Sequence, residues 1–171
     1  MDLRPAIPSD LPEIARLHEA NWRRDYVGIL PEVVLGAPLS AHMAKEWTVN
    51  ALDTRRVFVM VDGGSIVGFA AMQDDGPHEC AFLDNLHVEP SARAQGVGRA
   101  LMSAVAVLAV PGALTLDVLS ANTAARAIYR RWGGQESVEF DDEVLGVTVP
   151  AVTVGWRNTV DLLDRLRGQG R

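Results

Sequence analysis

A glycine-rich turn between an apolar strand and an apolar helix restricts the fold of this chain more than any other feature. The strand ends in Leu86-His87-Val88-Glu89-Pro90, and the segment Arg93-Ala94-Gln95-Gly96-Val97-Gly98-Arg99-Ala100 follows it. Gly96 and Gly98 let the backbone approach a ligand closely, and the helix that follows points free N–H groups and its positive dipole end toward that ligand. The pattern predicts an anion-binding loop, with a pyrophosphate as the expected anion.

Two common nucleotide-binding motifs do not account for this loop. The chain has no Gly-x-x-x-x-Gly-Lys-Ser/Thr sequence, which disfavours a nucleotide triphosphatase. The dinucleotide fingerprint Gly-x-Gly-x-x-Gly would need a glycine where Leu101 stands. A purely structural interpretation also stays open, in which Gly96 ends the loop and Gly98 allows close helix packing.

Length and composition indicate one globular domain over residues 1–171. Hydrophobic residues make up 48% and charged residues 22%, as in ordinary soluble proteins. The net charge of −6, without a basic run, argues against a nucleic-acid partner. Cys80 is the only cysteine, so we expect no disulfide, no metal site and a cytoplasmic location. The longest apolar run, at 105–110, is too short to cross a membrane.

Hydrophobic periodicity predicts a first half made of a strand, two helical stretches and a hairpin. The strand is expected at 3–6, and Asp10 with Glu13 predicts a capping box that opens the first helix. A second helical stretch contains Met43 and Trp47, one helical turn apart. Two β-rich runs at 57–61 and 66–72, joined by a turn at 62–65, predict an antiparallel hairpin.

The second half predicts a βαβα unit followed by two strands and a tail. The unit comprises a strand at 80–88, a helix at 97–110, a strand at 114–119 and a helix at 122–132, which implies parallel strands. Gly133 and Gly134 close the last helix, and final strands are expected at 137–140 and 147–156. The tail, 158–171, carries Leu162, Leu163 and Leu166, which could pack on the domain or on a neighbouring subunit, and its last residues are expected to fray.

The strand, Pro90, Arg93, Gly96 and Gly98 together closely resemble the acetyl-CoA-binding segment of the GNAT superfamily of acyltransferases. The segment from Asn122 to Tyr129 resembles the family's next segment. The resemblance covers most of the chain and is specific over 83–133. It implies an α/β (α+β) fold with a mixed, mostly antiparallel sheet, splayed parallel fourth and fifth strands and flanking helices. The cofactor-binding core would span about 80–134.

The resemblance also implies acetyl-CoA as the acyl donor and assigns its contacts. Main-chain N–H groups from about Gln95 to Ala100 would bind the pyrophosphate, the strand before the loop would follow the pantetheine arm, and two helical turns would bring Asn122 and Tyr129 beside the cofactor. The predicted cofactor-binding residues are Leu86, His87, Val88, Arg93, Ala94, Gln95, Gly96, Val97, Gly98, Arg99, Ala100, Asn122, Ala125 and Tyr129.

Catalysis would need a proton donor for the departing thiolate and a base for the incoming amine. Tyr129 is the candidate general acid, and Asp84 is the candidate base, with His87, His78 and Glu79 ranked below it. The structural alternatives are that Asn122 caps its helix, that Tyr129 only packs, and that Asp84 is a solvated strand carboxylate.

Trp22 and Tyr26 lie where the family usually builds one wall of the acceptor site, although they could equally belong to the core.

The predicted function is N-acetylation of a primary amine, on a small molecule or on a protein N-terminus or lysine, by direct attack in a ternary complex. Nothing marks Cys80 as an activated nucleophile. A noncatalytic acyl-CoA sensor and an interaction domain stay open, and the final strands could mediate a homodimer. Gly134 departs from the family, which often has a large apolar residue there, and Trp132 could fill the space.

Overall fold

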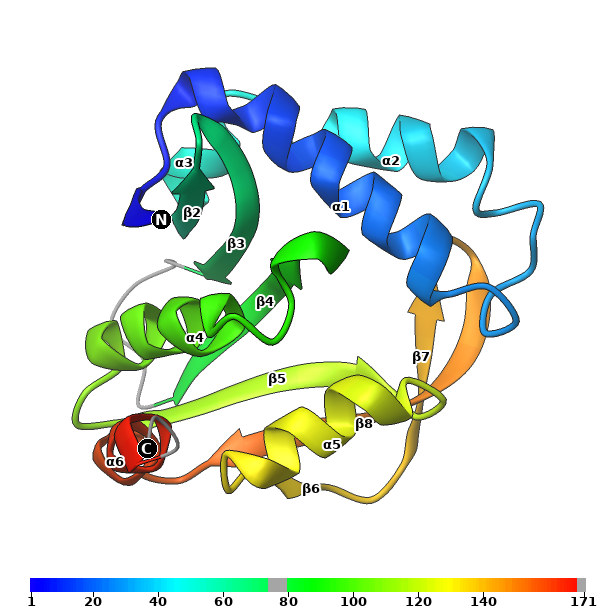
Figure 1. Ribbon diagram of the computed structural model, residues 1–171. Helices are drawn as coiled ribbons and strands as arrows, with labels where there is room; N and C mark the ends of the chain where they lie inside the picture. The colour runs from blue at the N-terminus through cyan, green and yellow to red at the C-terminus, as the bar shows by residue number, and fades with distance from the viewer. Residues whose placement is uncertain (74–79, 169–171) are drawn as a thin grey trace.

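The computed structural model of the chain describes residues 1–73 and 80–168. One mixed sheet runs through it in the order β1-β2-β3-β4-β5-β8-β6, and β7 pairs with β8 beside this path. Helices lie on both faces of the sheet (Figure 1). The helices α1 and α2 pack on one face of the N-terminal strands, and α4, α5 and α6 pack on the opposite face.

The first three strands form the predicted antiparallel layer. The strands β1 (Asp2–Pro5), β2 (Arg55–Asp62) and β3 (Ser65–Gln73) pair in sequence order. Gly63 and Gly64 connect β2 to β3 with φ values of 56° and 87°. Two successive positive φ values match the twist of a tight hairpin, and glycine adopts them without strain. The predicted hairpin is confirmed.

The helical segment between β1 and β2 corrects one local prediction. It contains η1 (Pro8–Asp10), α1 (Leu11–Asp25), α2 (Ala37–Glu46) and the unpredicted short α3 (Ala51–Thr54). The capping box of Asp10 and Glu13 is wrong, because both carboxylates have other partners. Asp10 accepts hydrogen bonds from Arg4 and from the Ile7 N–H, and Glu13 accepts one from the Ile66 N–H.

The sheet splays apart between β4 (Cys80–Val88) and β5 (Ala113–Leu119). These strands are joined through η2 (Pro90–Ala92) and α4 (Val97–Leu108). They are parallel, as predicted, but pair only from Cys80–Ala113 to Phe82–Thr115. Ala71 of β3 pairs with Asn85 of β4, and the next residue, Met72, pairs with Leu83. Asp84 is therefore an extra residue on β4 and forms a bulge. A bulge bends a strand and adds twist, so β4 turns away from β5 beyond this point.

Helix α5 (Thr123–Arg131) ends at the predicted glycines. Gly133 has φ 85°, and the Gly134 N–H donates to the Tyr129 carbonyl over 2.9 Å, which is the hydrogen bond of a Schellman motif. A Cβ at Gly134 would lie 2.5 Å from Val154 and 2.8 Å from Trp156. Val154 and Trp156 therefore fill the space beside Gly134 that Trp132 could have filled. Trp132 lies near Gly98 instead.

The last strands differ from their prediction. A short β6 (Gln135–Glu136) comes first, and β7 (Phe140–Val144) occupies most of the segment expected to connect two strands. The expected strand at 137–140 is wrong. The acidic run of β7 disfavours a strand locally, but hairpin pairing with β8 (Val147–Trp156) outweighs this preference. The turn uses Leu145 and Gly146 at φ 51° and 77°.

The tail forms α6 (Thr159–Gly168), which packs against α4 in the chain's own core. Leu162, Leu163 and Leu166 are buried there, so the intramolecular alternative holds. The predicted fraying concerns residues that extend beyond Gly168 and lie outside the described part. The mixed sheet, the splayed parallel β4–β5 pair and the flanking helices confirm the predicted fold class. Within the described residues, no helix is long and apolar enough to span a membrane.

Candidate active site

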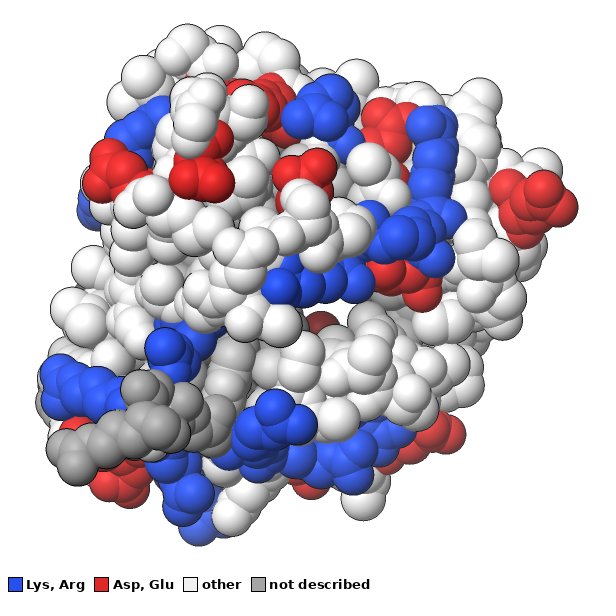
Figure 2. Space-filling view, in the orientation of Figure 1, with Lys and Arg blue, Asp and Glu red and all other residues white. Residues whose placement is uncertain are grey.

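A cavity of about 1170 Å³ lies where β4 and β5 separate. Its walls come from the end of α1, from β4, from the loop that begins α4, from β5, from α5 and from β7. Figure 2 shows a hollow in this region with basic side chains around its mouth and an acidic side chain at its depth. Segments that are far apart in the sequence therefore share one binding space.

The glycine-rich loop presents a row of unpaired N–H groups to this cavity. Ala94 and Gly96 have φ values of 60° and 83°, and such left-handed residues turn successive N–H groups toward one side. In the described part of the chain, no N–H group from Ala94 to Arg99 donates to a protein acceptor. The Ala100 N–H donates to the Gly96 carbonyl over 2.9 Å, so the free row ends one residue earlier than expected. This loop can bind an anion.

Arg93 stands at the edge of the cavity but is already engaged. Its Nη2 donates to Asp25 over 2.7 Å, and its Nε donates to the Val88 carbonyl over 3.2 Å. Burial opposes ionisation of Asp25, but hydrogen bonds from Arg24 and Arg93 outweigh it and lower the pKa of this carboxyl. Arg93 thus ties the end of α1 to the loop, while Arg99 extends over the loop near Gly96.

The bulged part of β4 leaves one backbone edge open. From Leu83 to Val88 the strand pairs with β3, but the described residues include no strand on its other side. Leu86, His87 and Val88 line the cavity along this edge. Free peptide groups on a strand edge can bind an extended ligand, as predicted for the pantetheine arm. The Val88 carbonyl is not one of them, because it accepts hydrogen bonds from Arg93 and Asn21.

Helix α5 contributes Asn122, Ala125 and Tyr129 to the wall, as the spacing predicts. The Asn122 side chain also caps the helix by accepting from the Ala125 N–H over 3.2 Å, which confirms the capping alternative. Burial, followed by the nearby Tyr26, raises the pKa of Tyr129 well above its ordinary value. Tyr129 therefore keeps its proton at neutral pH and faces the cavity.

Asp84 lies on the bulge and also lines the cavity. One of its oxygens accepts from Gln73 over 3.0 Å, and the other lies 3.2 Å from the Arg55 guanidinium. Asp84 is therefore anchored and is not an ordinary solvated carboxylate. Of the lower-ranked bases, His78 and Glu79 lie outside the described residues.

His87 lines the cavity and packs on its inner side against His18 and Phe69, with ring centroids 4.4 Å and 5.3 Å away. Burial, together with Arg93, lowers its pKa to about 4 despite the opposing effect of Asp25. The fully buried His18 accepts a hydrogen bond from Trp47 at Nδ1, and burial lowers its pKa well below the usual range. Both imidazoles are neutral at pH 7.

Trp22 and Tyr26 line the cavity from the end of α1, with ring centroids 5.0 Å apart. Asn21 and Asp25 on the same helix, and Asp142 and Val144 on β7, line it as well, although the sequence did not single them out. The β7 pair had been assigned to a connecting segment. For Asp25, the only signal was its position beside Tyr26.

Some predicted residues lie elsewhere. Val97, the first residue of α4, is buried in the core, and neither it nor Ala100 lines the cavity. Cys80 also lies outside it, with Sγ 3.6 Å from the Thr115 hydroxyl. The described residues hold no group of three histidine, cysteine or acidic side chains placed to bind a metal ion.

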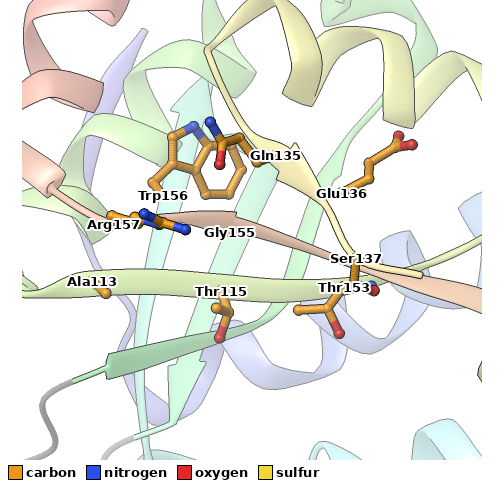
Figure 3. A pocket seen from close by; sticks show the side chains of 9 residues that line it. All are labelled: Ala113, Thr115, Gln135, Glu136, Ser137, Thr153, Gly155, Trp156 and Arg157. Atoms are coloured by element: carbon orange, nitrogen blue, oxygen red, sulfur yellow. The ribbon is translucent and has the colours of Figure 1, made fainter. Parts of the chain in front are cut away.

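A second depression of about 310 Å³ lies on the strands β5, β6 and β8 (Figure 3). Thr115 and Thr153 project from neighbouring strands there, and Glu136 points away from them toward its partner Arg126. None of the predicted site residues lines this depression. The larger cavity is therefore the candidate active site.

The splayed sheet and its cavity define the fold class as that of GNAT acyltransferases. The sequence model described as "Acetyltransferase (GNAT) family" matches residues 15–134, and the chain belongs to this family. It is 26% identical to the "Uncharacterized N-acetyltransferase YuaI" of Bacillus subtilis over 161 residues, 90% of this chain and 91% of that protein.

Two further comparisons agree with this assignment. The chain is 29% identical over 103 residues to "Aminoglycoside N(6')-acetyltransferase type 1" of Salmonella typhimurium, covering 56% of this chain and 68% of the relative. Its fold is similar to the crystal structure of the PaiA N-acetyltransferase of Thermoplasma acidophilum in complex with coenzyme A. That match has a TM-score of 0.73 and 16% identity and covers 88% of this chain and 96% of the other.

Proposed function

We propose that this acetyltransferase moves an acetyl group from acetyl-CoA to a primary amine by direct attack within a ternary complex. The observation that carries the proposal is that one cavity joins the unpaired N–H row at Ala94–Arg99, the open edge of β4 and the protonated Tyr129. An acyl donor and an acceptor can meet in such a space without a covalent enzyme intermediate. The position of Cys80 outside the cavity supports this route.

The residues present fit acetyl-CoA. The N–H row and the N-terminal end of α4 suit a pyrophosphate, since both attract negative charge. The open edge of β4 suits the amide groups of pantetheine, and Asn122 and Ala125 flank the opposite side. Bound in this way, acetyl-CoA supplies a thioester for amine attack.

Two side chains would handle the protons. Asp84, held by Arg55 and Gln73, takes a proton from the acceptor ammonium, directly or through water, so that the nitrogen attacks as a neutral amine. The carbon–nitrogen bond forms as the carbon–sulfur bond breaks. Tyr129, which burial keeps protonated, gives its phenolic proton to the thiolate as the carbon–sulfur bond breaks. The new amide nitrogen loses its second proton through water to the tyrosinate, which restores Tyr129, and Asp84 returns its proton to solvent.

The acceptor is a small-molecule amine or the N-terminus or a lysine of a protein. The similarity to an aminoglycoside acetyltransferase supports an amine acceptor of some kind. The walls formed by α1 and β7 would select it, because they do not contribute to the cofactor loop.

Calorimetric titration of acetyl-CoA and free CoA tests the proposal, with Gly98→Glu as the informative variant. A Cβ at Gly98 would make ordinary contacts with Val88 at 3.6 Å and Trp132 at 3.9 Å, so the variant should fold, while its carboxylate would enter the anion site. The matched control is Val107→Glu, an exposed position on the same helix. We expect binding in the wild type and in the control and none in Gly98→Glu. No binding to the wild type would sink the proposal, and CoA release in an amine screen would complete it.

A further inference from the structure

Basic and acidic groups come from different walls of the cavity. The basic lining residues Arg93, Arg99 and Arg131 belong to the cofactor loop and to α5. Of the acidic lining residues, Asp25 on α1 and Asp84 on β4 are paired with arginines, and Asp117 and Asp142 lie on β5 and β7. The anionic donor and the acceptor would therefore meet opposite potentials.

Asp142 is the half-buried carboxylate of the site whose charge no basic group of the described residues balances. Its Oδ1 accepts a hydrogen bond from the Glu143 N–H, but no basic group of the described chain lies within 4.0 Å of it. In the same part of the chain Asp117 has no basic partner either, but it is exposed and accepts a hydrogen bond from the Thr153 hydroxyl over 2.6 Å. Asp25 and Asp84, by contrast, have arginine partners. A half-buried carboxylate that faces a ligand cavity without a cation favours a ligand that supplies one.

The strand geometry makes this orientation specific to Asp142. Along β7 the side chains alternate, so that Asp142 and Val144 are half-buried and line the cavity, while Asp141 and Glu143 are exposed on the other side. Two neighbouring aspartates thus differ mainly in the face of the strand they occupy.

Aromatic rings on α1 complete the surroundings for a cation. Trp22 and Tyr26 line the same cavity, and a cation is attracted to the faces of such rings. Burial, and to a lesser degree Asp25, raises the pKa of Tyr26 to about 12. The phenol of Tyr26 is therefore neutral at pH 7, and it presents an uncharged aromatic ring to the cavity.

We infer that the acceptor is a small primary amine carrying a second cationic group, which Asp142 binds beside Trp22 and Tyr26. The inference rests on the proposed function. The reacting nitrogen loses its charge to Asp84 before it attacks, so the lasting charge of Asp142 calls for a cation elsewhere on the same molecule. The chemical class is a diamine or polyamine, in preference to a monoamine or an amino acid.

Three acceptors of similar length test the inference: putrescine, butylamine and γ-aminobutyrate, which end in a cation, a methyl group and an anion. CoA release is measured at saturating acetyl-CoA. We expect kcat/KM to be highest for putrescine and lowest for γ-aminobutyrate. Asp142→Asn should lower kcat/KM for putrescine about tenfold, which is the loss of one charge-assisted hydrogen bond, and should lower kcat/KM for butylamine much less.

Asp141→Asn is the matched control, because it removes the same charge from the outer face of β7 and should alter neither acceptor. Equal use of putrescine and butylamine by the wild type, or equal effects of the two variants, would overturn the inference while leaving amine acetylation intact. Turnover of none of the three amines would also overturn it. The acetyl-CoA titration would then show separately whether the donor site survives. Thermal melting of both variants checks that each is folded.

Discussion

The backbone N–H of Gly134 donates to the carbonyl oxygen of Tyr129 over 2.9 Å, and this bond fixes the end of α5 on which the candidate acid stands. Val154 and Trp156 pack so closely around Gly134 that no side chain fits there. The Trp156 indole N–H also donates to the Trp132 carbonyl over 3.0 Å. The position of Tyr129 therefore depends on a glycine outside the cavity.

Gly134→Ala should destabilise the protein by about 1–3 kcal/mol, the usual cost of overpacking. Its new Cβ would lie 2.5 Å from Val154 Cγ1 and 3.0 Å from the Tyr129 carbonyl, so β8 or α5 must move. Chemical denaturation measures the loss. Gly155→Ala is the control, because its Cβ would meet only Thr115, at 3.5 Å. Equal stability of the two variants would contradict this account of Gly134.

The contrast between β8 and β7 illustrates what the sequence could predict. β8 was predicted with its observed bounds, because its apolar residues identify a buried strand whatever its partner. β7 was missed because Asp141, Asp142 and Glu143 favour a turn locally, and only pairing with β8 makes them a strand.

The candidate site shows the same contrast between features that follow from local sequence and features that depend on long-range contacts. The row of free N–H groups follows from the local sequence between Ala94 and Arg99, so motif and geometry agree. The Asp25–Arg93 ion pair joins residues 68 positions apart, and no local pattern could reveal it. The sequence therefore predicted most of the cofactor loop and placed Trp22 and Tyr26 beside the cavity, whereas the lining residues Asp25, Asp142 and Val144 became evident only in the structure.

Replacing Tyr129 with phenylalanine should lower kcat by about a hundredfold, which lies within the usual range for loss of a general acid. The affinity for acetyl-CoA should stay unchanged, because the ring and its packing are kept. Since burial raises the pKa of Tyr129 well above 10, kcat of the wild type should show no decline from loss of this proton up to about pH 10. Steady-state kinetics and calorimetry measure both. A kcat within a few-fold of the wild type would exclude Tyr129 as the acid.

Asp84→Asn tests the base. The amide keeps the shape and can still bond to Gln73 after a flip, but it cannot take a proton, so kcat should fall by about a hundredfold. Loss of the partly buried Arg55 pair should also lower stability modestly, so denaturation accompanies the kinetics. Asp53→Asn, an exposed position outside the cavity, is the control. If the variant retained wild-type kcat, the base would have to be sought elsewhere in the cavity.

The buried histidines predict how stability depends on pH. The pKa of His87 falls from 6.5 to about 4 on folding, chiefly through burial, so the unfolded chain binds more protons than the folded one between these values. The contribution of the neutral His87 ring to the free energy of unfolding is therefore fully present above about pH 6.5, and it is lost as the pH falls toward 4. His18 has a pKa lowered in the same direction and adds to the effect.

Urea denaturation of the wild type and of His87→Gln at pH 7, 5.5 and 4.5 separates the two contributions. The wild type should lose free energy of unfolding across this series, and His87→Gln should lose less, because only His18 and the carboxyls with a lowered pKa, such as Asp25, then contribute. His42→Gln, which removes a histidine that is 40% exposed, should follow the wild type. If His87→Gln lost stability as steeply as the wild type, burial of His87 would not be the source of the acid sensitivity, and His18 with the carboxyls of lowered pKa would have to account for the slope.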